Sequence, residues 1–429
     1  MSPKSAHPRR PRRGRKSPVY VLGATTAGLA VMRSLGRRGI PVFALESPPR
    51  PPGHYSRYAR PILLPDFREN EGAWLDRLLL CADGADPRPV LIPAGDDEVL
   101  FVARHRRLLA ERFRFNIPND DALSVACDKA LLYRFAAETG VPVPETRFPE
   151  GPPDEANPDP GEIGFPCLVK PTRSHLWRRR GGAEKLAVAR DRHDLERLYR
   201  KMWRPGEPLM IQEIVPGGDN ALYGYLSCWD RRSRPLVLFT KRKLRQHPVH
   251  FGNGSLQVSE RNETTAEQSI LLLSALAYSG VASIEYKRDD RDGSFKLLDL
   301  NPRTVSGEQL AVDSGVDIPY IHYLDVIGED APATPPFREG VKYVHLSWDV
   351  QSLLSQRKKG TLPFHRWLLS LAGVRSFALL SLSDPAPSLV LLGRASRLGA
   401  RKIAAALPIL IGRRRGKGPE RSSRAPHNS

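Results

Sequence analysis

The sequence of 429 residues is poor in cysteine and contains no long hydrophobic run. Its four cysteines are far apart and form no C-x-x-C pair, which argues against a zinc ribbon, a thiol redox motif and a disulfide scaffold. The longest nearly apolar stretch, Ile403–Gly412, is interrupted by Pro408 and is shorter than the ~20 residues of a membrane-spanning helix. We therefore expect a cytoplasmic protein with buried, reduced thiols.

Positive charge is concentrated at the two ends of the chain. The net charge is +19, of which residues 1–16 contribute +7 and residues 394–429 contribute +9. Positive and negative charges are nearly balanced in the region between these ends, which argues against nucleic-acid binding as the main function. A basic protein that binds nucleic acid or a membrane surface through its tails remains an alternative hypothesis.

Proline- and glycine-rich segments divide the sequence into units. We predict a basic disordered tail over residues 1–17, an α/β domain over 18–121 and a second domain over 122–330. A C-terminal appendage with a basic helical tail is predicted over 331–429. The sequence contains no internal repeat.

The first unit begins with a β-turn-α-β pattern, which predicts a parallel sheet. Val19–Leu22 and Pro41–Leu45 are the two strands, with a helix between them. Gly23 and Gly28 form only part of a dinucleotide-binding fingerprint, because the central glycine is missing. Glu46 stands where such a fold places the acid that binds ribose. An NAD-linked oxidoreductase is therefore a second alternative function.

The later units alternate helices with strands. The predicted helices are 129–139, 194–202 and 265–278, and the predicted strands are 167–171, 209–213, 221–229 and 236–241. A further helix is predicted where Phe364, Trp367, Leu368 and Leu371 recur at helical spacing. Near the C-terminus, Arg394, Arg397 and Arg401 line one face of a basic amphipathic helix, a pattern that can make peripheral contact with a membrane.

The segment 281–303 predicts a hairpin with oxygen-bearing side chains on one face. Two strands flank a turn that contains Asp292 followed by glycine. Glu285 and Asp299 each lie seven residues from Asp292, so a hairpin centred there places them opposite each other. Asn301 is two residues beyond Asp299 and therefore points to the same face.

Two neighbouring carboxylates repel each other unless positive charge lies between them. Mg²⁺ prefers hard oxygen ligands, usually one or two carboxylates together with phosphate oxygens and waters, so we predict a magnesium site here, with Mn²⁺ as the alternative ion. Arg303 continues on the same side and can reach an anion held by that metal. Leu298 and Leu300 are expected to face the opposite way, into a core.

Together with this hairpin, several motifs in order along the chain resemble those of the ATP-grasp superfamily, in its carboxylate–amine ligase branch. They are Asp128-Lys129 at a helix start, the strand that ends at Lys170, the loop 172–185, the segment 210–219 and the charged run 241–245. The resemblance covers residues 18–330. It implies an N-terminal Rossmann-like α/β domain, a two-lobed ATP-grasp domain of α+β type and a helical C-terminal appendage.

The resemblance also implies roles for particular residues. Lys129 and Lys170 would contact the phosphates of ATP, and Lys185, at the end of the phosphate-covering loop 172–185, would clamp the γ-phosphate together with Arg178–Arg180. The hinge that holds adenine would contain Gln212, Glu213 and Val215, with Asp219 on the ribose. The carboxylate substrate and the acyl phosphate would lie near Lys241 and Arg245, and Arg303 would steady the transferred phosphoryl group.

The activity implied by the resemblance is ATP- and Mg²⁺-dependent ligation. A carboxylate is activated as an acyl phosphate and joined to an amine, and ADP and phosphate are released. The expected partners are therefore a small-molecule carboxylate and an amine, whose identities the sequence leaves open. Residues 53–58 and 96–98 of the first unit are candidate substrate contacts.

Overall fold

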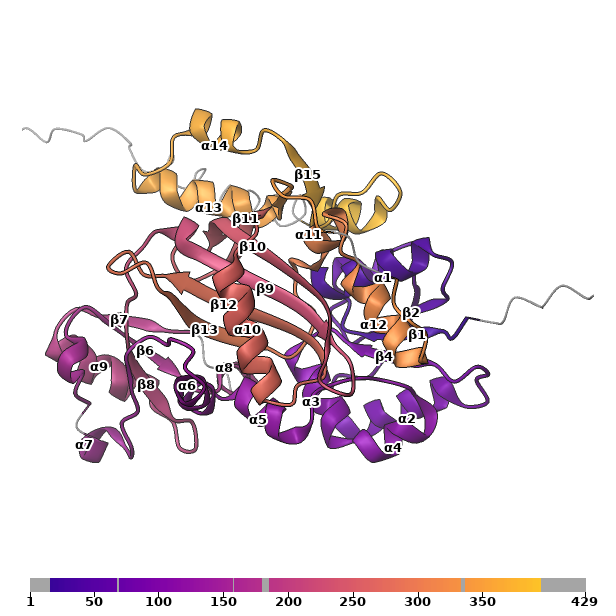
Figure 1. Cartoon of the computed structure of the whole chain (residues 1–429), viewed down its shortest axis with the longest axis horizontal. Coiled ribbons are helices and arrows are strands. Elements are labelled where there is room, and N and C mark those ends of the chain that lie inside the picture. The colour runs from indigo at the N-terminus through magenta and orange to yellow at the C-terminus, as the bar shows by residue number, and fades with distance from the viewer. Residues whose placement is uncertain (1–15, 68, 157, 180–184, 333–335, 395–429) are drawn as a thin grey trace, which may run out of the picture.

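Three β-sheets form the framework of the protein (Figure 1). A computed structural model describes residues 16–67, 69–156, 158–179, 185–332 and 336–394. The N-terminal sheet and a small sheet have four strands each, and a large sheet with seven strands lies between them. No helix among the described residues is long and apolar enough to cross a membrane.

The N-terminal sheet is parallel, with the strand order β3-β2-β1-β4. The predicted β-turn-α-β pattern is confirmed, because α1 connects two parallel neighbours, β1 and β2. The elements of this part are β1 (Val19–Leu22), α1 (Thr26–Arg37), β2 (Val42–Glu46), β3 (Arg60–Leu63), α2 (Glu71–Ala82), β4 (Val90–Pro93), α3 (Asp96–Arg104) and α4 (Arg106–Arg112).

The backbone of the turn between β1 and α1 accounts for the presence of Gly23 and Gly28, so these two glycines do not require a bound dinucleotide. A Cβ on Gly28 would lie only 2.0 Å from the carbonyl oxygen of Gly23, and Gly23 itself has φ +92°. The Glu46 carboxylate accepts hydrogen bonds from the backbone N–H groups of Ala24 (2.7 Å) and Ser47 (3.1 Å). Glu46 therefore fastens the turn, and the NAD hypothesis loses the acid on which it depended.

The small sheet is antiparallel, with the order β5-β8-β6-β7. The predicted strands 167–171 and 209–213 have these bounds in the structure, and they pair along their whole length. The elements here are α5 (Asp120–Cys127), α6 (Lys129–Glu138), β5 (Thr146–Arg147), α7 (Pro153–Ala156), β6 (Cys167–Pro171), α8 (Ser174–Arg179), β7 (Ala187–Ala189), α9 (Arg192–Met202) and β8 (Leu209–Glu213).

The large sheet has the order β13-β12-β9-β10-β11-β14-β15. One face packs against α5, α6 and α10, and part of the other face packs against α11 and α12. Its elements are β9 (Leu222–Trp229), β10 (Pro235–His247), β11 (Asn253–Ser259), α10 (Glu263–Ala275), β12 (Gly280–Arg288), β13 (Phe295–Asn301), α11 (Glu308–Asp313), α12 (Ile318–Ile327), β14 (Lys342–Val344), α13 (Leu346–Lys358), α14 (Phe364–Ser370) and β15 (Val374–Phe377).

The C-terminal region is helical, as expected, but it also extends the large sheet. β14 pairs with β11 in antiparallel fashion, and β15 adds a parallel edge strand beyond it. The predicted helix near residue 364 is confirmed as α14, although only Trp367 of its apolar face is buried. Of the predicted basic helix, Arg394 is helical, whereas Arg397 and Arg401 lie outside the described residues. All four cysteines are free thiols, two buried and two half-buried.

A buried ion pair connects this C-terminal region to the N-terminal sheet. Arg33 of α1 is 1% exposed and its Nε lies 3.0 Å from Asp384, which is fully buried. The same carboxylate accepts hydrogen bonds from Ser56 Oγ (2.8 Å) and the backbone N–H of Arg57 (2.9 Å). Two residues of the predicted substrate-contact segment 53–58 therefore serve this connection.

We predict that Asp384→Ala lowers the free energy of unfolding by about 3–5 kcal/mol, because it leaves the Arg33 guanidinium buried without its acid. Urea denaturation followed by circular dichroism measures the change. The matched control is Asp154→Ala, which breaks a 3.3 Å surface pair with Arg200 and should change stability by less than about 1 kcal/mol. Equal stability of the two variants would contradict the structural role of Asp384.

Candidate active site

The predicted hairpin is confirmed as β12 and β13, and Glu285 lies directly opposite Asp299. A β-bulge produces this register. Near the turn, Tyr286 pairs with Leu297, and continuation of that register would place Asp299 opposite Ile284. The extra residue in the bulge is Leu298, which shifts the pairing by one and brings the two carboxylates together.

The bulge also corrects one prediction about the core. Leu297 and Leu300 are buried, with 0% and 1% exposure, whereas Leu298 is only half-buried. The prediction that Leu298 faces the core was wrong, because strict alternation fails at a bulge. The backbone carbonyl of Leu298 accepts a 2.9 Å hydrogen bond from the Tyr133 hydroxyl of α6, which holds the bulge in place.

A polar row crosses the large sheet from the hairpin to β10. Glu285 pairs with Gly224 of β9, and Gly224 pairs on its other side with Lys241 of β10. A Cβ on Gly224 would lie 2.8 Å from Lys241 Cε, so the glycine leaves room for the lysine side chain. Lys243 comes two residues after Lys241, and its Nζ lies 2.8 Å from Glu285 Oε1.

Three predicted phosphate-binding lysines approach the same carboxylates from the small-sheet side. Lys129, at the start of α6, forms an ion pair with Asp299. Lys170 ends β6, and Lys185 follows the predicted phosphate-covering loop. Burial lowers the pKa of Lys170 well below its usual value, and the positive charges of Lys129 and Lys185 lower it further, whereas Asp299 opposes the shift. These groups therefore lie within electrostatic reach of one another.

The resulting cluster carries an excess of positive charge. It contains the carboxylates Glu285 and Asp299 and the lysines Lys129, Lys170, Lys185, Lys241 and Lys243. Burial opposes ionisation of Glu285, but the charges of Lys243, Lys185 and Lys241 lower its pKa. Three of the five lysines have no carboxylate partner in the cluster, an arrangement that suits a multivalent anion.

The predicted metal ligands fit a divalent cation only in combination with an anionic ligand. The side chains of Glu285 and Asp299 are 35% and 32% exposed, so their oxygens are accessible. The described residues contain no group of three or more His, Cys, Asp or Glu side chains that could hold a metal. Two carboxylates and the Asn301 amide form a hard-oxygen donor set, which suits Mg²⁺ if phosphate oxygens and waters complete the coordination.

Arg303 is positioned by the N-terminal domain. Its Nε and Nη2 lie 2.5 and 3.0 Å from the two carboxylate oxygens of Asp96, at the start of α3. Nη2 also lies 3.4 Å from Asn301 Oδ1, so the arginine adjoins the predicted metal ligands. Asp96 was predicted as a substrate contact, and in this structure it orients Arg303 instead.

The structure does not place Arg245 with the catalytic cluster. Its guanidinium forms two 2.8 Å hydrogen bonds with Asp349 of α13, which is fully buried. Asp349 also accepts hydrogen bonds from Ser255 Oγ and Trp367 Nε1. β-Bulges on both sides of Arg245 break the alternation that would have aligned it with Lys241 and Lys243. Arg245 therefore attaches the C-terminal helices to the sheet.

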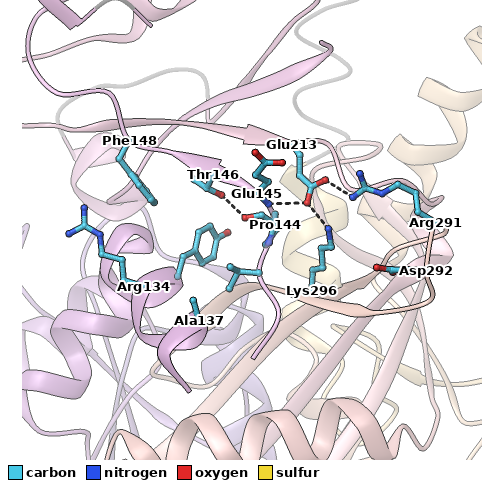
Figure 2. A pocket seen from close by; sticks show the side chains of 12 residues that line it. Arg134, Ala137, Pro144, Glu145, Thr146, Phe148, Glu213, Arg291, Asp292 and Lys296 are labelled. Atoms are coloured by element: carbon cyan, nitrogen blue, oxygen red, sulfur yellow. Dashed lines mark hydrogen bonds and ion pairs between the residues drawn. The ribbon is translucent and has the colours of Figure 1, made fainter. Parts of the chain in front are cut away.

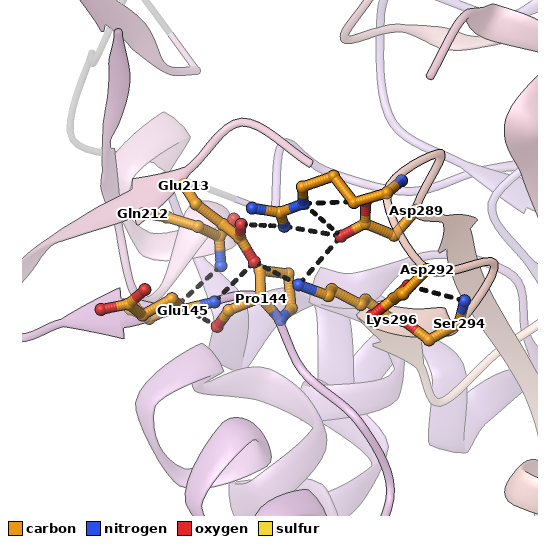
Figure 3. A network of polar contacts seen from close by, with 10 residues as sticks. Pro144, Glu145, Gln212, Glu213, Asp289, Asp292, Ser294 and Lys296 are labelled. Carbon is orange, nitrogen blue, oxygen red and sulfur yellow. Dashed lines mark hydrogen bonds and ion pairs between the residues drawn. The ribbon is translucent and has the colours of Figure 1, made fainter. Parts of the chain in front are cut away.

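The side chains of the predicted hinge bind other protein groups. Glu213 accepts hydrogen bonds from the backbone N–H of Glu145 (2.9 Å) and from Lys296 (2.7 Å), and it pairs with Arg291 (Figures 2 and 3). Gln212 donates to Thr146 Oγ1 at 2.9 Å. Any ligand contact from these two residues must therefore come from the backbone, as must any contact from the nearby Val215, which is 4% exposed.

The Glu213 network also connects the two lobes of the second domain, namely the small sheet and the large sheet. Asp289 in the β12–β13 turn is fully buried and binds both Arg291 and Lys296, which in turn bind Glu213 of β8 (Figure 3). Beside the network lies a pocket of about 660 Å³, whose lining includes Tyr133. Phe148 and Arg134 lie on one side of it (Figure 2). The hairpin that carries Glu285 and Asp299 is thus held against the small sheet.

Asp219, the predicted ribose ligand, lies at the start of a 3₁₀ turn after the hinge. Its Oδ1 accepts a 2.9 Å hydrogen bond from Gln246 Nε2 of β10.

In the predicted loop 172–185, the structure shows a short helix, α8. Its Trp177 is buried, and the guanidinium carbon of Arg204 lies 5.0 Å from the centre of the Trp177 ring. Gly181 and Gly182 lie outside the described residues.

Sequence reasoning missed a buried acid beside Lys241. Glu308, at the start of α11, is 0% exposed, and neither carboxylate oxygen has a hydrogen-bond partner among the described residues. A Cβ on Gly307 would lie 1.9 Å from Lys241 Nζ, so this ammonium lies against the start of α11. Burial raises the pKa of Glu308 to about 8 and lowers that of Lys241 to about 8. Gln257 Oε1 is also buried without a partner there.

The only sequence signal for Glu308 was its place five residues after Arg303, at the start of a helix. A surface acid in the first turn of a helix gives the same pattern. Lys243 lay within the charged run that was singled out, but its pairing with Glu285 depends on strand register. Neither residue could be chosen without the three-dimensional structure.

The geometry defines a mixed α/β protein in which a pair of carboxylates lies beside a group of lysines. Residues 236–348 match the model of a family described as ATP-grasp in the biosynthetic pathway with Ter operon. Among curated proteins, the D-aspartate ligase of Enterococcus faecium is 22% identical over 269 residues, which are 59% of this chain and 62% of that protein.

A second curated relative is the formate-dependent phosphoribosylglycinamide formyltransferase of Mycolicibacterium smegmatis. It is 30% identical over 162 residues, which cover 37% of this chain and 38% of the relative. The chain thus spans less than two thirds of the length of either protein.

Solved structures share the fold over most of the chain. The N5-carboxyaminoimidazole synthetase of Staphylococcus aureus complexed with ADP has a TM-score of 0.61 at 14% identity, covering 80% of this chain and 86% of that one. The L-amino acid ligase of Bacillus licheniformis has a TM-score of 0.56 at 15% identity, with coverage of 73% and 74%. These structures share the fold of this chain, and the predicted fold class is confirmed.

We predict that removing one lysine from the cluster weakens polyanion binding by about five- to tenfold, the effect of one charge at ~4–6 Å in a partly screened site. Isothermal titration with inorganic tripolyphosphate should show this loss for Lys170→Ala and for Lys243→Ala. Lys358→Ala, on the exposed end of α13, serves as the control and should bind as the parent does. Equal affinity of all four proteins would contradict the assignment of the anion site.

Proposed function

We propose that this protein is an ATP- and Mg²⁺-dependent ligase that activates a carboxylate as an acyl phosphate and joins it to an amine. The observation that carries the proposal is the Glu285–Asp299 pair, which faces five lysines contributed by both lobes. A pair of acids beside excess positive charge suits a metal-bound triphosphate. The match of residues 236–348 to an ATP-grasp family model supports the same activity.

Each part of the cluster has a role in this reaction. Lys129, Lys170 and Lys185 neutralise and orient the phosphates, which is most of the work that phosphoryl transfer requires. Glu285, Asp299 and Asn301 would hold magnesium, which when bound supplies positive charge to the phosphate oxygens. Arg303 steadies the transferred phosphoryl group, in an orientation that the N-terminal domain fixes through Asp96.

Lys241 and Glu308 suit the second half of the reaction. The amine nitrogen attacks the carbonyl carbon of the acyl phosphate, the bond between that carbon and the bridging oxygen breaks, and phosphate leaves with the electron pair of this bond. The amine then has a proton to release. The ionised form of Glu308 is a stronger base than an ordinary carboxylate, because its pKa is raised to about 8, and it can accept this proton. The ammonium of Lys241 is placed to stabilise the developing charge.

The direct test is a screen of carboxylates and amines with MgATP that measures release of ADP and phosphate. Amino acids come first, because the Enterococcus relative is a D-aspartate ligase. Hydroxylamine in place of the amine should trap the acyl phosphate as a hydroxamate. If none of the carboxylates increased the release of ADP from MgATP, the result would contradict ligation.

We predict that Asp299→Asn reduces acid-dependent ADP release at least about a hundredfold, because it removes one of two predicted metal-binding carboxylates and the counter-charge of Lys129. The protein should remain folded, since Asp299 is one-third exposed. Asp292→Asn, in the exposed hairpin turn, is the matched control and should retain activity. Full acid-dependent turnover by Asp299→Asn would disprove the metal assignment.

Glu308→Gln should gain stability while it loses ligation. Because the pKa of Glu308 is raised to about 8, the folded protein keeps a proton that the unfolded chain releases above pH ~4.5, so wild-type stability falls as the pH rises between these values. Glutamine removes this loss, and we expect the variant to be more stable by about 2–3 kcal/mol at pH 7 and by almost nothing at pH 4. Urea denaturation at both pH values measures the difference, and a constant difference would contradict the buried-acid account.

A further inference from the structure

Exposed apolar side chains are concentrated on the two helices that follow β14. On α13, Leu346, Val350 and Leu354 lie at i, i+4 and i+8 and are 42%, 36% and 53% exposed. The buried residues of α13 are Asp349, Ser352 and Leu353, through which the helix packs on the protein. We call the outward side of α13, together with α14, the α13–α14 face.

α14 exposes still more apolar surface. Phe364, Leu368 and Leu369 are 51%, 56% and 70% exposed, and Trp367 is the only buried residue of the helix. The two helices are adjacent at the upper edge of the molecule in Figure 1. Single exposed leucines are ordinary on a protein surface, whereas two neighbouring helices that each expose three large apolar residues mark an interaction site.

The same region is positively charged and contains no exposed acid. From residue 350 to residue 383 the sequence has no Asp or Glu. The one acid of α13, Asp349, is fully buried and paired with Arg245. Five cations of this region are exposed, namely Arg357, Lys358, Lys359, Arg366 and Arg375.

The sequence that follows has the same composition. Residues 394–429 carry ten Lys and Arg and a single acid, Glu420, and they include the apolar stretch Ile403–Ile411. The C-terminal fifth of the chain thus combines large apolar residues with cations and almost no acids. This combination is typical of segments that lie at the interface of an anionic bilayer, where apolar side chains enter the acyl region and cations contact headgroup phosphates.

We propose that the α13–α14 face binds the surface of a membrane that contains anionic lipids. A nucleic acid would satisfy the cations but offers no environment for six exposed apolar side chains. The position of the face is compatible with catalysis. α13 packs on β10 and β11, whereas the Glu285–Asp299 hairpin forms the β13 edge of the large sheet, so a bilayer on the outward side of the helices need not cover the hairpin.

The test is cosedimentation of the full chain with vesicles of phosphatidylcholine alone or with about one third phosphatidylglycerol. We expect binding only to the anionic vesicles, and we expect it to weaken as salt increases. The double variant Leu368→Ser/Leu369→Ser and the triple variant Arg357→Gln/Lys358→Gln/Lys359→Gln should each bind about tenfold more weakly or worse. Leu80→Ser, which changes an exposed leucine of α2, is the control and should bind as the parent does.

Three outcomes would overturn the proposal. The first is equal vesicle binding by the parent and both α13–α14 variants, which would assign all binding to other basic segments. The second is binding to a DNA duplex that these variants weaken while vesicle binding is absent. The third is loss of a dimer in the Leu368→Ser/Leu369→Ser variant without any vesicle binding by the parent, which would make the face a contact between copies of the chain.

Discussion

The pairing of two carboxylates with a larger group of lysines is the constraint on which the rest of the site depends. Glu285 and Asp299 lie side by side only because a bulge shifts the hairpin by one residue. The lysines come from both lobes, so the charge balance exists only when the lobes face each other. Three of the five lysines lack a carboxylate partner in the cluster, and a bound polyphosphate would supply the missing negative charge.

Much of the surrounding structure keeps that arrangement fixed. Buried Asp289 and Glu213, with the cations between them, hold the hairpin against the small sheet (Figure 3). Asp96 orients Arg303 from the N-terminal domain, and Arg245 attaches the C-terminal helices through Asp349. Charged residues outside the cluster therefore act mainly by positioning it. Glu308 is different, because an unpaired buried acid costs stability and is best explained by a role in the reaction.

The sequence allowed the fold and most of the cluster to be predicted, because these depend on local patterns. Hydrophobic runs located β6 and β8, and symmetry about the turn located Glu285 opposite Asp299. Departures from ideal strand geometry could not be predicted. Bulges displaced Leu298 from the core and Arg245 from the cluster. Residues defined by what surrounds them in space, such as Glu308, have no local signature.

The central claim is that the two hairpin carboxylates bind a divalent cation next to a polyphosphate. Electron paramagnetic resonance of Mn²⁺, titrated into the protein with and without ADP, tests it most directly. We expect tight Mn²⁺ binding that requires ADP and that the double variant Glu285→Gln/Asp299→Asn abolishes. Mn²⁺ binding of unchanged strength in that variant, with ADP present, would contradict the claim.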